Sequence, residues 1–124
     1  MPDPIRTLII DDEWLVRWAL AHMLTHHGCI VVEREDVASG MRALTESSDG
    51  FDVILLDHKL PDGTGLDLLT TIKRLAPTSS VVMMSAYMSR DEVDEALRRG
   101  AVACVPKPFD VDAVCQLVLS ASRH

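Results

Sequence analysis

Short apolar runs alternate along the whole chain with longer segments in which apolar residues recur at helical spacing. The runs predict strands at residues 5–10, 30–35, 53–56, 81–84 and 101–105. The longer segments predict helices at residues 13–27, 39–47, 64–75, 89–99 and 110–122. Repeated strand–helix units with right-handed crossovers build a parallel sheet with helices on both faces. The alternation therefore restricts the chain to an α/β architecture.

The order of the strands follows from their composition. Residues 30–35 begin with β-branched side chains but end in charged ones, which indicates an edge strand. Residues 53–56 are uniformly apolar, as is typical of a central strand covered on both faces. Of the two orders considered for five strands, this favours the flavodoxin-like order 2-1-3-4-5. We expect one domain, residues 1–124, with a flavodoxin-like (βα)5 doubly wound parallel sheet and a turn at residues 61–63.

Composition and charge exclude several functions for this domain. The net charge is −7, and a negative field repels phosphate backbones and anionic lipid, so we expect neither direct nucleic-acid binding nor membrane binding. No apolar run is long enough for a transmembrane helix, and the first residues lack the pattern of a signal peptide. Three widely spaced cysteines argue against a disulfide framework, so we expect a cytoplasmic domain.

Charged and hydroxyl side chains follow the predicted strands at their carboxyl ends. These residues are Asp11, Asp12, Asp57, Ser85 and Lys107. In doubly wound sheets this edge is where ligands bind. Three neighbouring carboxylates repel one another strongly and call for a cation, and Mg²⁺ prefers oxygen ligands. A phosphoryl group would complement the cation and the lysine, and an aspartate carboxylate is a known nucleophile for its transfer.

Four sequence segments, taken together, resemble the response-regulator receiver domains of two-component signalling. They are LIIDDE (8–13), VILLDHKLPDGTGLDLL (53–69), VVMMSAY (81–87) and GAVACVPKPF (100–109). Each segment alone is a weak signal, but all four occur in the order and spacing of that family. The second and third segments most resemble receivers of nitrogen-regulator-type transcription activators, which is an analogy at the level of the family.

The resemblance implies a role for each residue at the strand ends. Asp57 is the phosphoacceptor, and the Mg²⁺ ligands are Asp12 and Asp57 directly, Asp11 through water, and the carbonyl of Lys59. Ser85 and the backbone N–H of Ala86 bind the phosphoryl group. Lys107 pairs with a phosphoryl oxygen and, in the resting state, with Asp57, and the Lys107–Pro108 peptide bond is cis.

The resemblance also implies a function and its partners. Asp57 takes a phosphoryl group from a sensor histidine kinase, a phosphotransfer protein or a small acyl phosphate, with Mg²⁺ as the cofactor. Phosphorylation then switches the face formed by the fourth helix, the fifth strand and the fifth helix, and a phosphorylation-dependent homodimer is a further expectation. The domain is not an enzyme in the usual sense, because it catalyses only its own phosphorylation and dephosphorylation.

One switch position departs from the family pattern. The family usually has an aromatic residue three positions before the lysine, where this chain has Cys104. Tyr87 is a candidate for the moving aromatic side chain in its place. Lys59 and Tyr87 are also expected to obstruct the hydrolytic water, which predicts a phosphoryl lifetime nearer hours than seconds.

Two tryptophans stand one helical turn apart and off the expected inward stripe of the first helix. Exposed tryptophan pairs often mark contact surfaces, and in the resembled family this helix docks the phosphodonor. We therefore consider Trp14 or Trp18 a kinase contact, with packing against a neighbouring loop or helix as the alternative. His22 and His26 stand one helical turn apart, a spacing at which two histidines can bind a metal, but a solvated helix face is the favoured interpretation.

Three other interpretations remain for comparison. A haloacid-dehalogenase-like phosphatase needs a second acid two residues after the nucleophile, where this chain has Lys59. A flavodoxin-like electron carrier needs a phosphate-binding loop after the first strand, and Asp11, Asp12 and Glu13 would repel that phosphate. The third interpretation is a degenerate receiver that acts as a phosphorylation-independent binding module. The presence of all five key residues at the strand ends argues against it.

Overall fold

The computed structural model describes residues 3–122 of the chain. The strands are β1 (Arg6–Ile10), β2 (Ile30–Arg34), β3 (Val53–Asp57), β4 (Lys59–Leu60), β5 (Gly63–Thr64), β6 (Ser80–Ser85) and β7 (Ala101–Pro106). The helices are α1 (Trp14–His26), α2 (Val37–Glu46), α3 (Gly65–Leu75), α4 (Arg90–Arg98) and α5 (Val111–Ala121). Every predicted strand and helix is present, and the boundaries differ by one or two residues.

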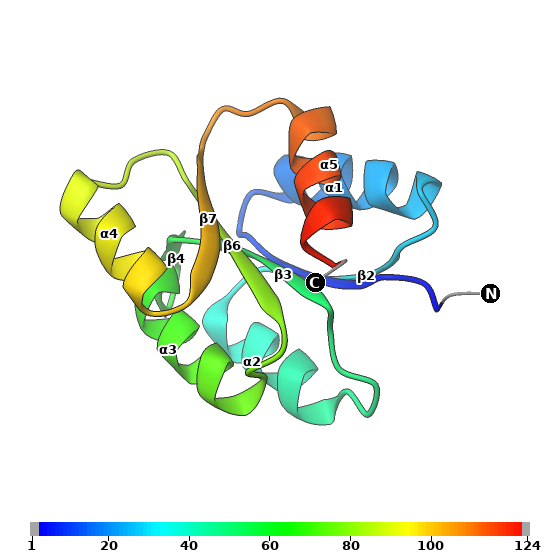
Figure 1. Cartoon of the computed structure of the whole chain (residues 1–124), viewed down its shortest axis with the longest axis horizontal. Helices are drawn as coiled ribbons and strands as arrows, with labels where there is room; N and C mark the ends of the chain where they lie inside the picture. Colours follow the sequence, from blue (N-terminus) through cyan, green and yellow to red (C-terminus); the bar gives the residue numbers. More distant parts are fainter. Residues whose placement is uncertain (1–2, 123–124) are drawn as a thin grey trace.

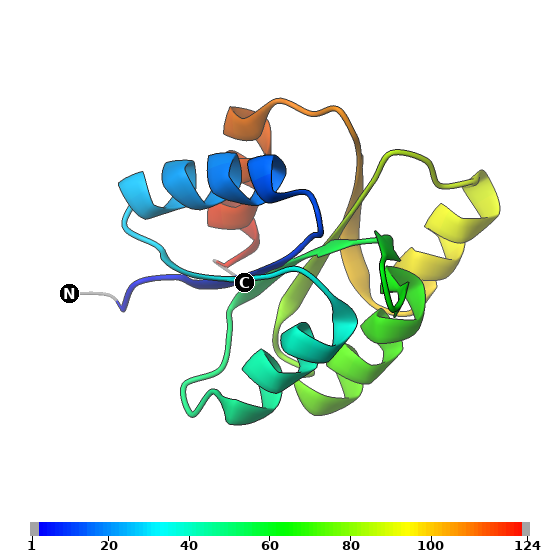
Figure 2. The same ribbon diagram turned by 180° about the vertical axis from the view of Figure 1, so that it is seen from behind.

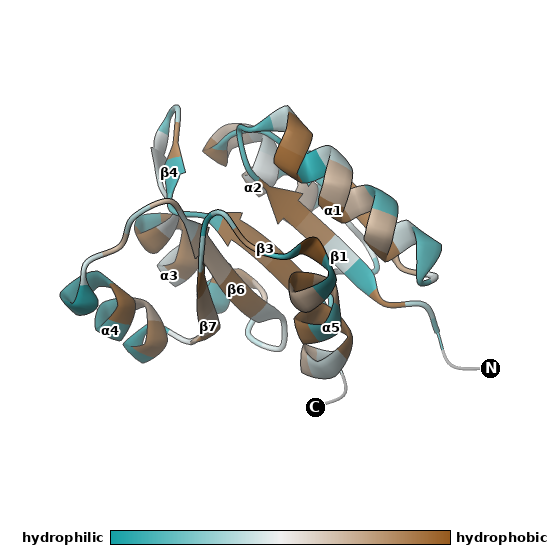
Figure 3. Ribbon diagram, turned by 90° about the horizontal axis from the view of Figure 1, so that it is seen from above, coloured by the Kyte–Doolittle hydropathy of each residue, from teal (hydrophilic) through white to brown (hydrophobic). Residues whose placement is uncertain are grey.

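Five of the strands form one parallel sheet in the order β2-β1-β3-β6-β7. This confirms the flavodoxin-like order, with β2 at one edge and β3 at the centre. Helices α1 and α5 cover one face of the sheet, and α2, α3 and α4 cover the other (Figures 1 and 2). The central strands β3 and β6 are strongly hydrophobic (Figure 3), because side chains on both of their faces are buried. None of the helices within residues 3–122 is long and apolar enough to cross a membrane.

Local capping fixes the helix boundaries. Helix α2 begins at Val37, two residues before the expected start at residue 39, because the Asp36 side chain accepts a hydrogen bond from the Ser39 N–H at 2.8 Å. Asp110 caps α5 as expected. Gly28 and Gly100 follow α1 and α4 with φ of 86° and 109°, a conformation that glycine adopts without strain.

The loop after β3 contains a small antiparallel hairpin, β4–β5, that the sequence did not predict. Its tip includes the predicted turn at residues 61–63. The carboxylate of Asp62 accepts backbone hydrogen bonds from Val37 at 2.7 Å and Ala38 at 3.0 Å, so the tip is attached to the start of α2. Gly65 then begins α3 in close contact with β3, where a Cβ atom would clash with the backbone oxygen of Asp57.

Candidate functional site

Three carboxylates meet at the carboxyl edge of the sheet, as the sequence predicted. Asp57 is the last residue of β3, and Asp11 and Asp12 directly follow the neighbouring strand β1. One oxygen of each of the three lies within 4.8 Å of the others. Asp11 and Asp57 are buried, whereas Asp12 is exposed. The cluster therefore has an open side toward solvent.

The position of Asp11 is fixed by its own backbone and by the start of α1. Its N–H donates to the Arg34 carbonyl at 3.0 Å, and its carbonyl accepts from the Arg17 guanidinium at 2.6 Å. Its Oδ1 accepts from the Glu13 N–H at 2.9 Å. Asp11 is thus held by β2, α1 and the turn between β1 and α1, which leaves Oδ2 directed to the site.

The electrostatics of the cluster favour a cation. Burial, followed by repulsion from Asp11, raises the pKa of Asp57 from its ordinary 3.8 to about 7, although Lys107 acts in the opposite direction. The protein's own lysine therefore does not balance the negative charge of the site. Three carboxylates at this spacing are the donor set that a hard divalent ion such as Mg²⁺ takes, so these residues fit the predicted metal.

Lys107 reaches the same site from the loop after β7. Its Nζ lies 2.7 Å from Asp11 Oδ2, 2.8 Å from Glu13 Oε1 and 3.5 Å from Asp57 Oδ2. Burial by itself would lower the pKa of Lys107, but hydrogen bonds to Asp11 and Glu13 raise it above its ordinary value. The predicted pair with Asp57 is present, and the shorter contacts are to Asp11 and Glu13. The Lys107–Pro108 bond is cis, as predicted.

Glu13 is the site residue that the sequence analysis did not assign. It is the last of three consecutive acidic residues after β1. Roles were predicted for the first two, and the presence of a third acid was the signal that could have indicated Glu13. In the structure it precedes the first residue of α1, and its side chain is directed toward Lys107.

A cavity of about 250 Å³ brings the remaining predicted residues together. Its lining residues are Asp12, Glu13, Asp57, Lys59, Ser85, Ala86 and Tyr87. The hydroxyl of Ser85 donates to the Tyr87 carbonyl at 2.7 Å and accepts from the Tyr87 N–H at 3.1 Å. The serine is therefore engaged with its own loop, and Tyr87 is 69% exposed.

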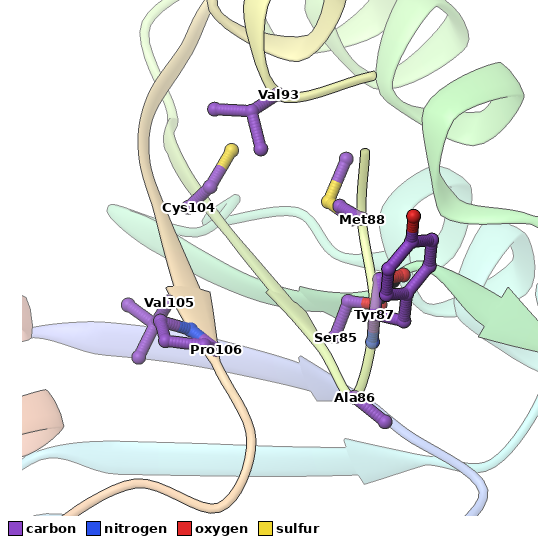
Figure 4. Close-up of a pocket in the computed structure, with 8 residues that line it drawn as sticks. All are labelled: Ser85, Ala86, Tyr87, Met88, Val93, Cys104, Val105 and Pro106. Atoms are coloured by element: carbon purple, nitrogen blue, oxygen red, sulfur yellow. Dashed lines mark hydrogen bonds between the residues drawn. The ribbon is translucent and has the colours of Figure 1, made fainter. Parts of the chain in front are cut away.

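A second cavity, of about 370 Å³, lies between the loop after β6, the first turns of α4 and strand β7. Figure 4 shows Cys104, Met88 and Val93 around this space, with the ring of Tyr87 at its margin. Cys104 is half-buried and its small side chain leaves the space open. The position at which the sequence departs from the family pattern is therefore a wall of a cavity.

The two tryptophans of α1 are largely exposed, which favours the contact-surface interpretation over packing against a neighbouring loop or helix. Trp14 is 67% exposed, and Trp18 is 57% exposed, with its ring stacked on His22 of the same helix at 5.4 Å between centroids. Leu15 beside them is also exposed, whereas Leu20 and Leu24 of the same helix are buried. Trp14, Leu15 and Trp18 form an exposed apolar patch, called here the α1 patch.

Comparison with known proteins identifies the family. The sequence matches the family described as the response regulator receiver domain over residues 7–119. The chain therefore belongs to the response regulator receiver domain family, and it is a receiver domain of two-component signalling.

Curated relatives include proteins much longer than this chain. The chain is 34% identical over 116 residues to the DNA-binding transcriptional regulator NtrC of Escherichia coli (strain K12), which covers 94% of this chain and 24% of that protein. It is 35% identical over 118 residues to the response regulator protein PilR of Pseudomonas aeruginosa, covering 95% of this chain and 26% of that protein. The chain thus spans about a quarter of the length of these relatives.

Solved structures share the fold over nearly the whole chain. The CheY-like receiver domain protein from Methanospirillum hungatei JF-1 has a TM-score of 0.91 at 25% identity, covering 98% of this chain and 95% of that one. A chain of the CheX-CheY-BeF3-Mg+2 complex from Borrelia burgdorferi has a TM-score of 0.86 at 26% identity, covering 94% of this chain and 88% of that one.

Proposed function

We propose that Asp57 accepts a phosphoryl group in a Mg²⁺-dependent reaction and that this modification switches the domain. The observation that carries the proposal is the meeting of the Asp11, Asp12 and Asp57 carboxylates with the Lys107 ammonium at one edge of the sheet. Their geometry provides a nucleophile, a cation site and a fixed positive charge for an anionic group. The Borrelia burgdorferi complex, which contains BeF3 and Mg²⁺, is consistent with the same chemistry.

The carboxylates of Asp11, Asp12 and Asp57 and the carbonyl of Lys59 would hold the metal. A bound Mg²⁺ supplies neutralising charge for these carboxylates and for the phosphoryl oxygens. An oxygen of Asp57 attacks phosphorus in line, a P–O bond to Asp57 forms, and the bond to the donor's imidazole nitrogen or acyl oxygen breaks. Lys107 stabilises the charge on a phosphoryl oxygen, and the protein contributes position and electrostatics rather than a further covalent step.

The phosphoryl donor is a sensor histidine kinase, a phosphotransfer protein or a small acyl phosphate. The α1 patch supports a protein donor, because it exposes three large apolar side chains on the helix that begins directly after Asp11 and Asp12. Alanine substitution of Trp14 or Trp18 should slow transfer from the protein donor but not from acetyl phosphate. Unchanged transfer from the protein donor in both variants would remove the α1 patch from the donor interface.

The response to phosphorylation involves the loop after β6. Ser85 and the Ala86 N–H would turn to the phosphoryl oxygens, so Ser85 would exchange its contacts with the Tyr87 backbone. Tyr87 is the aromatic side chain beside the cavity at Cys104 and is our candidate for the moving ring. The affected face is α4, β7 and α5, where a phosphorylation-dependent homodimer or an output partner would bind.

Lys59 and Tyr87 border the site at which a hydrolytic water would approach Asp57. Both line the 250 Å³ cavity with Asp57, which supports a long phosphoryl lifetime, nearer hours than seconds. Faster hydrolysis in Lys59→Ala is the expected result, and equal or slower hydrolysis would contradict it.

The regulated process is transcription, by analogy with the longer relatives NtrC and PilR. This domain has a net charge of −7, so DNA contact would fall to other parts of such a protein or to a partner. A cytoplasmic location follows from this role. The alternative function is a degenerate receiver that binds its partner without phosphorylation.

Intact mass spectrometry after incubation with acetyl phosphate tests the proposal. One phosphoryl adduct should form in the presence of Mg²⁺, vanish with a chelator and be missing in Asp57→Asn. The matched control is Asp49→Asn, an exposed aspartate near the amino ends of the strands and so at the opposite edge of the sheet, which should keep the adduct. An adduct retained by Asp57→Asn would overturn the acceptor assignment, and its formation without divalent metal would overturn the role of Mg²⁺.

A further inference from the structure

A buried histidine directly follows the phosphoacceptor and has no role in the proposed chemistry. His58 is 5% exposed, and both of its backbone groups are hydrogen-bonded. Its N–H donates to the Met84 carbonyl at 2.9 Å, and its carbonyl accepts from the Gly65 N–H at 2.6 Å. The backbone of His58 is therefore fixed between the end of β6 and the start of α3.

The side chain of His58 connects this fixed point to helix α4. Its Nε2 lies 3.0 Å from Oε2 of Glu92, in the first turn of α4. The other oxygen of Glu92 accepts from the Ser89 N–H at 3.0 Å, and the Glu92 N–H donates to the Ser89 hydroxyl at 3.1 Å. Glu92 thus uses one carboxylate oxygen for the capping box of α4 and the other for His58.

Helix α4 has few other contacts that hold its N-terminal end. Among residues 90–98, all of them described, Ala96 alone is buried. Val93, one residue after Glu92, borders the 370 Å³ cavity together with Cys104 and Met88 (Figure 4). Because apolar packing is incomplete on this side, the contact between Glu92 and His58 has a large share in fixing the first turn of α4.

We propose that the His58–Glu92 contact restrains the first turn of α4 in its resting position and opposes the conformation that phosphorylation of Asp57 favours. This inference rests on the proposed function. The loop of residues 86–89 leads from Ser85 into the capping box, so a shift of that loop toward Asp57 displaces Ser89. His58 cannot follow, since its backbone is held by Met84 and Gly65. Glu92 must then break its hydrogen bonds either with Ser89 or with His58.

Thermodynamic linkage gives the restraint a measurable consequence. A contact made only in the resting conformation stabilises that conformation by some factor. It weakens the binding of any ligand that favours the other conformation by that same factor. Removing the contact should therefore tighten the binding of a phosphoryl mimic. Because Glu92 is partly exposed, we take the net contribution of an ordinary hydrogen bond, which predicts a change of about fivefold.

The experiment is titration of the full chain with beryllium fluoride in excess Mg²⁺, followed by tryptophan fluorescence or calorimetry. His58→Leu removes the hydrogen bond with little change in volume and leaves the capping box intact. Glu92→Ala removes the same hydrogen bond from the exposed side, together with the bond from the Ser89 N–H, and Ser89→Ala controls for the weakened cap. Both should bind the mimic about fivefold more tightly than the wild type. The double variant should gain no more than either single variant, because both remove the same contact.

Ser89→Ala is the matched control, because it weakens the capping box but leaves the Ser89 N–H and His58 bonded to Glu92. It should speed amide hydrogen exchange in the first turn of α4 without tightening the binding of the mimic. Equal tightening in Ser89→Ala would show that general loosening of α4 is sufficient and would overturn the restraint. Unchanged affinity in both His58→Leu and Glu92→Ala would also overturn it. Failure of the wild type to bind the mimic at all would instead refute the proposed function and, with it, this inference.

Discussion

The two sides of the carboxyl edge of the sheet are built differently. Around β3 and α3 the chain is tightly packed, with all five residues of β3 buried and α3 contributing Leu68, Leu69 and Ile72 to the core. Around α4 and β7 the packing is open, with Ala96 as the buried residue of α4 and a cavity of about 370 Å³ beneath its first turns. The residue that carries the proposed chemistry belongs to the tight side, and the face proposed to respond belongs to the open side.

This difference suits the two tasks that the proposed function gives to the two regions. A phosphoacceptor needs a fixed geometry, because in-line transfer depends on the position of the nucleophile. A responding face needs two arrangements of similar free energy, which a fully packed core does not offer. Four measurements test whether the two regions differ in this way.

The largest expected effect concerns the charge held within the tight side. Burial and Asp11 raise the pKa of Asp57 from 3.8 to about 7, so the folded state favours the protonated carboxyl. Its contribution to stability is complete below pH 4 and is lost as the pH rises through 7, by an amount on the order of 4 kcal/mol. In chelator, urea unfolding should show that the advantage of Asp57→Asn over the wild type grows from pH 4 to pH 8. A constant difference across that range would contradict the raised pKa.

The second measurement compares apolar truncations on the two sides. Leu69→Ala removes a fully buried side chain from α3 and should cost about 3 kcal/mol of unfolding free energy. Val93→Ala removes a partly buried side chain that already borders a cavity, and should cost about 1 kcal/mol or less. Urea denaturation of both variants gives the two values. Equal costs would show that the open side is packed as firmly as the tight side.

The third measurement adds one methyl group to the tight side. A Cβ at position 65 would clash with the backbone oxygen of Asp57, so Gly65→Ala should lower the unfolding free energy by about 2 kcal/mol. It should also slow phosphorylation by acetyl phosphate, because the relief of the clash displaces the acceptor. The control is Thr70→Ala on the exposed part of α3, which loses a long hydrogen bond from Arg99 at 3.4 Å and should change both properties little. Normal stability in Gly65→Ala would mean that β3 and α3 separate easily.

The smallest effect is expected from filling the open side. Cys104→Phe places an aromatic ring beside the cavity and should raise the unfolding free energy by about 1 kcal/mol. Val102→Phe, on an exposed position of the same strand, is the control and should give no gain. A loss of stability in Cys104→Phe would show that the cavity is too narrow for a ring, which would also count against Tyr87 as its occupant.

The sequence predicted the sheet and the site residues through two kinds of signal. Apolar periodicity located every helix and every strand of the five-stranded sheet. The charged residues at the end of β2 indicated that this strand lies at the edge. The residues at the strand ends were predictable because parallel strands bring their carboxyl ends to one edge. These features depend on local pattern and on general rules of topology.

Two of the features that were not predicted depend on contacts between segments far apart in the chain. Glu13 shares Lys107 with Asp11 only because the loop after β7 folds back over β1. The contact of His58 with Glu92 joins residues 34 positions apart, and neither carries a local signal for the other. The early start of α2 was different, since Asp36 is a capping residue that local sequence could have indicated.

The attachment of the β4–β5 hairpin to α2 makes the surroundings of the site more rigid on one side than on the other. Asp62 binds two backbone N–H groups of α2, so the segment that follows the acceptor is supported on that side by a second helix. On the other side the loop after β6 borders a cavity and the ring of Tyr87 lies in solvent. A displacement that starts at Asp57 is therefore resisted by hydrogen-bonded segments toward α2, whereas the cavity leaves room for movement toward α4. A protein that bound over α2 would sense little of the state of Asp57, whereas one that bound over α4 and β7 would sense most of it.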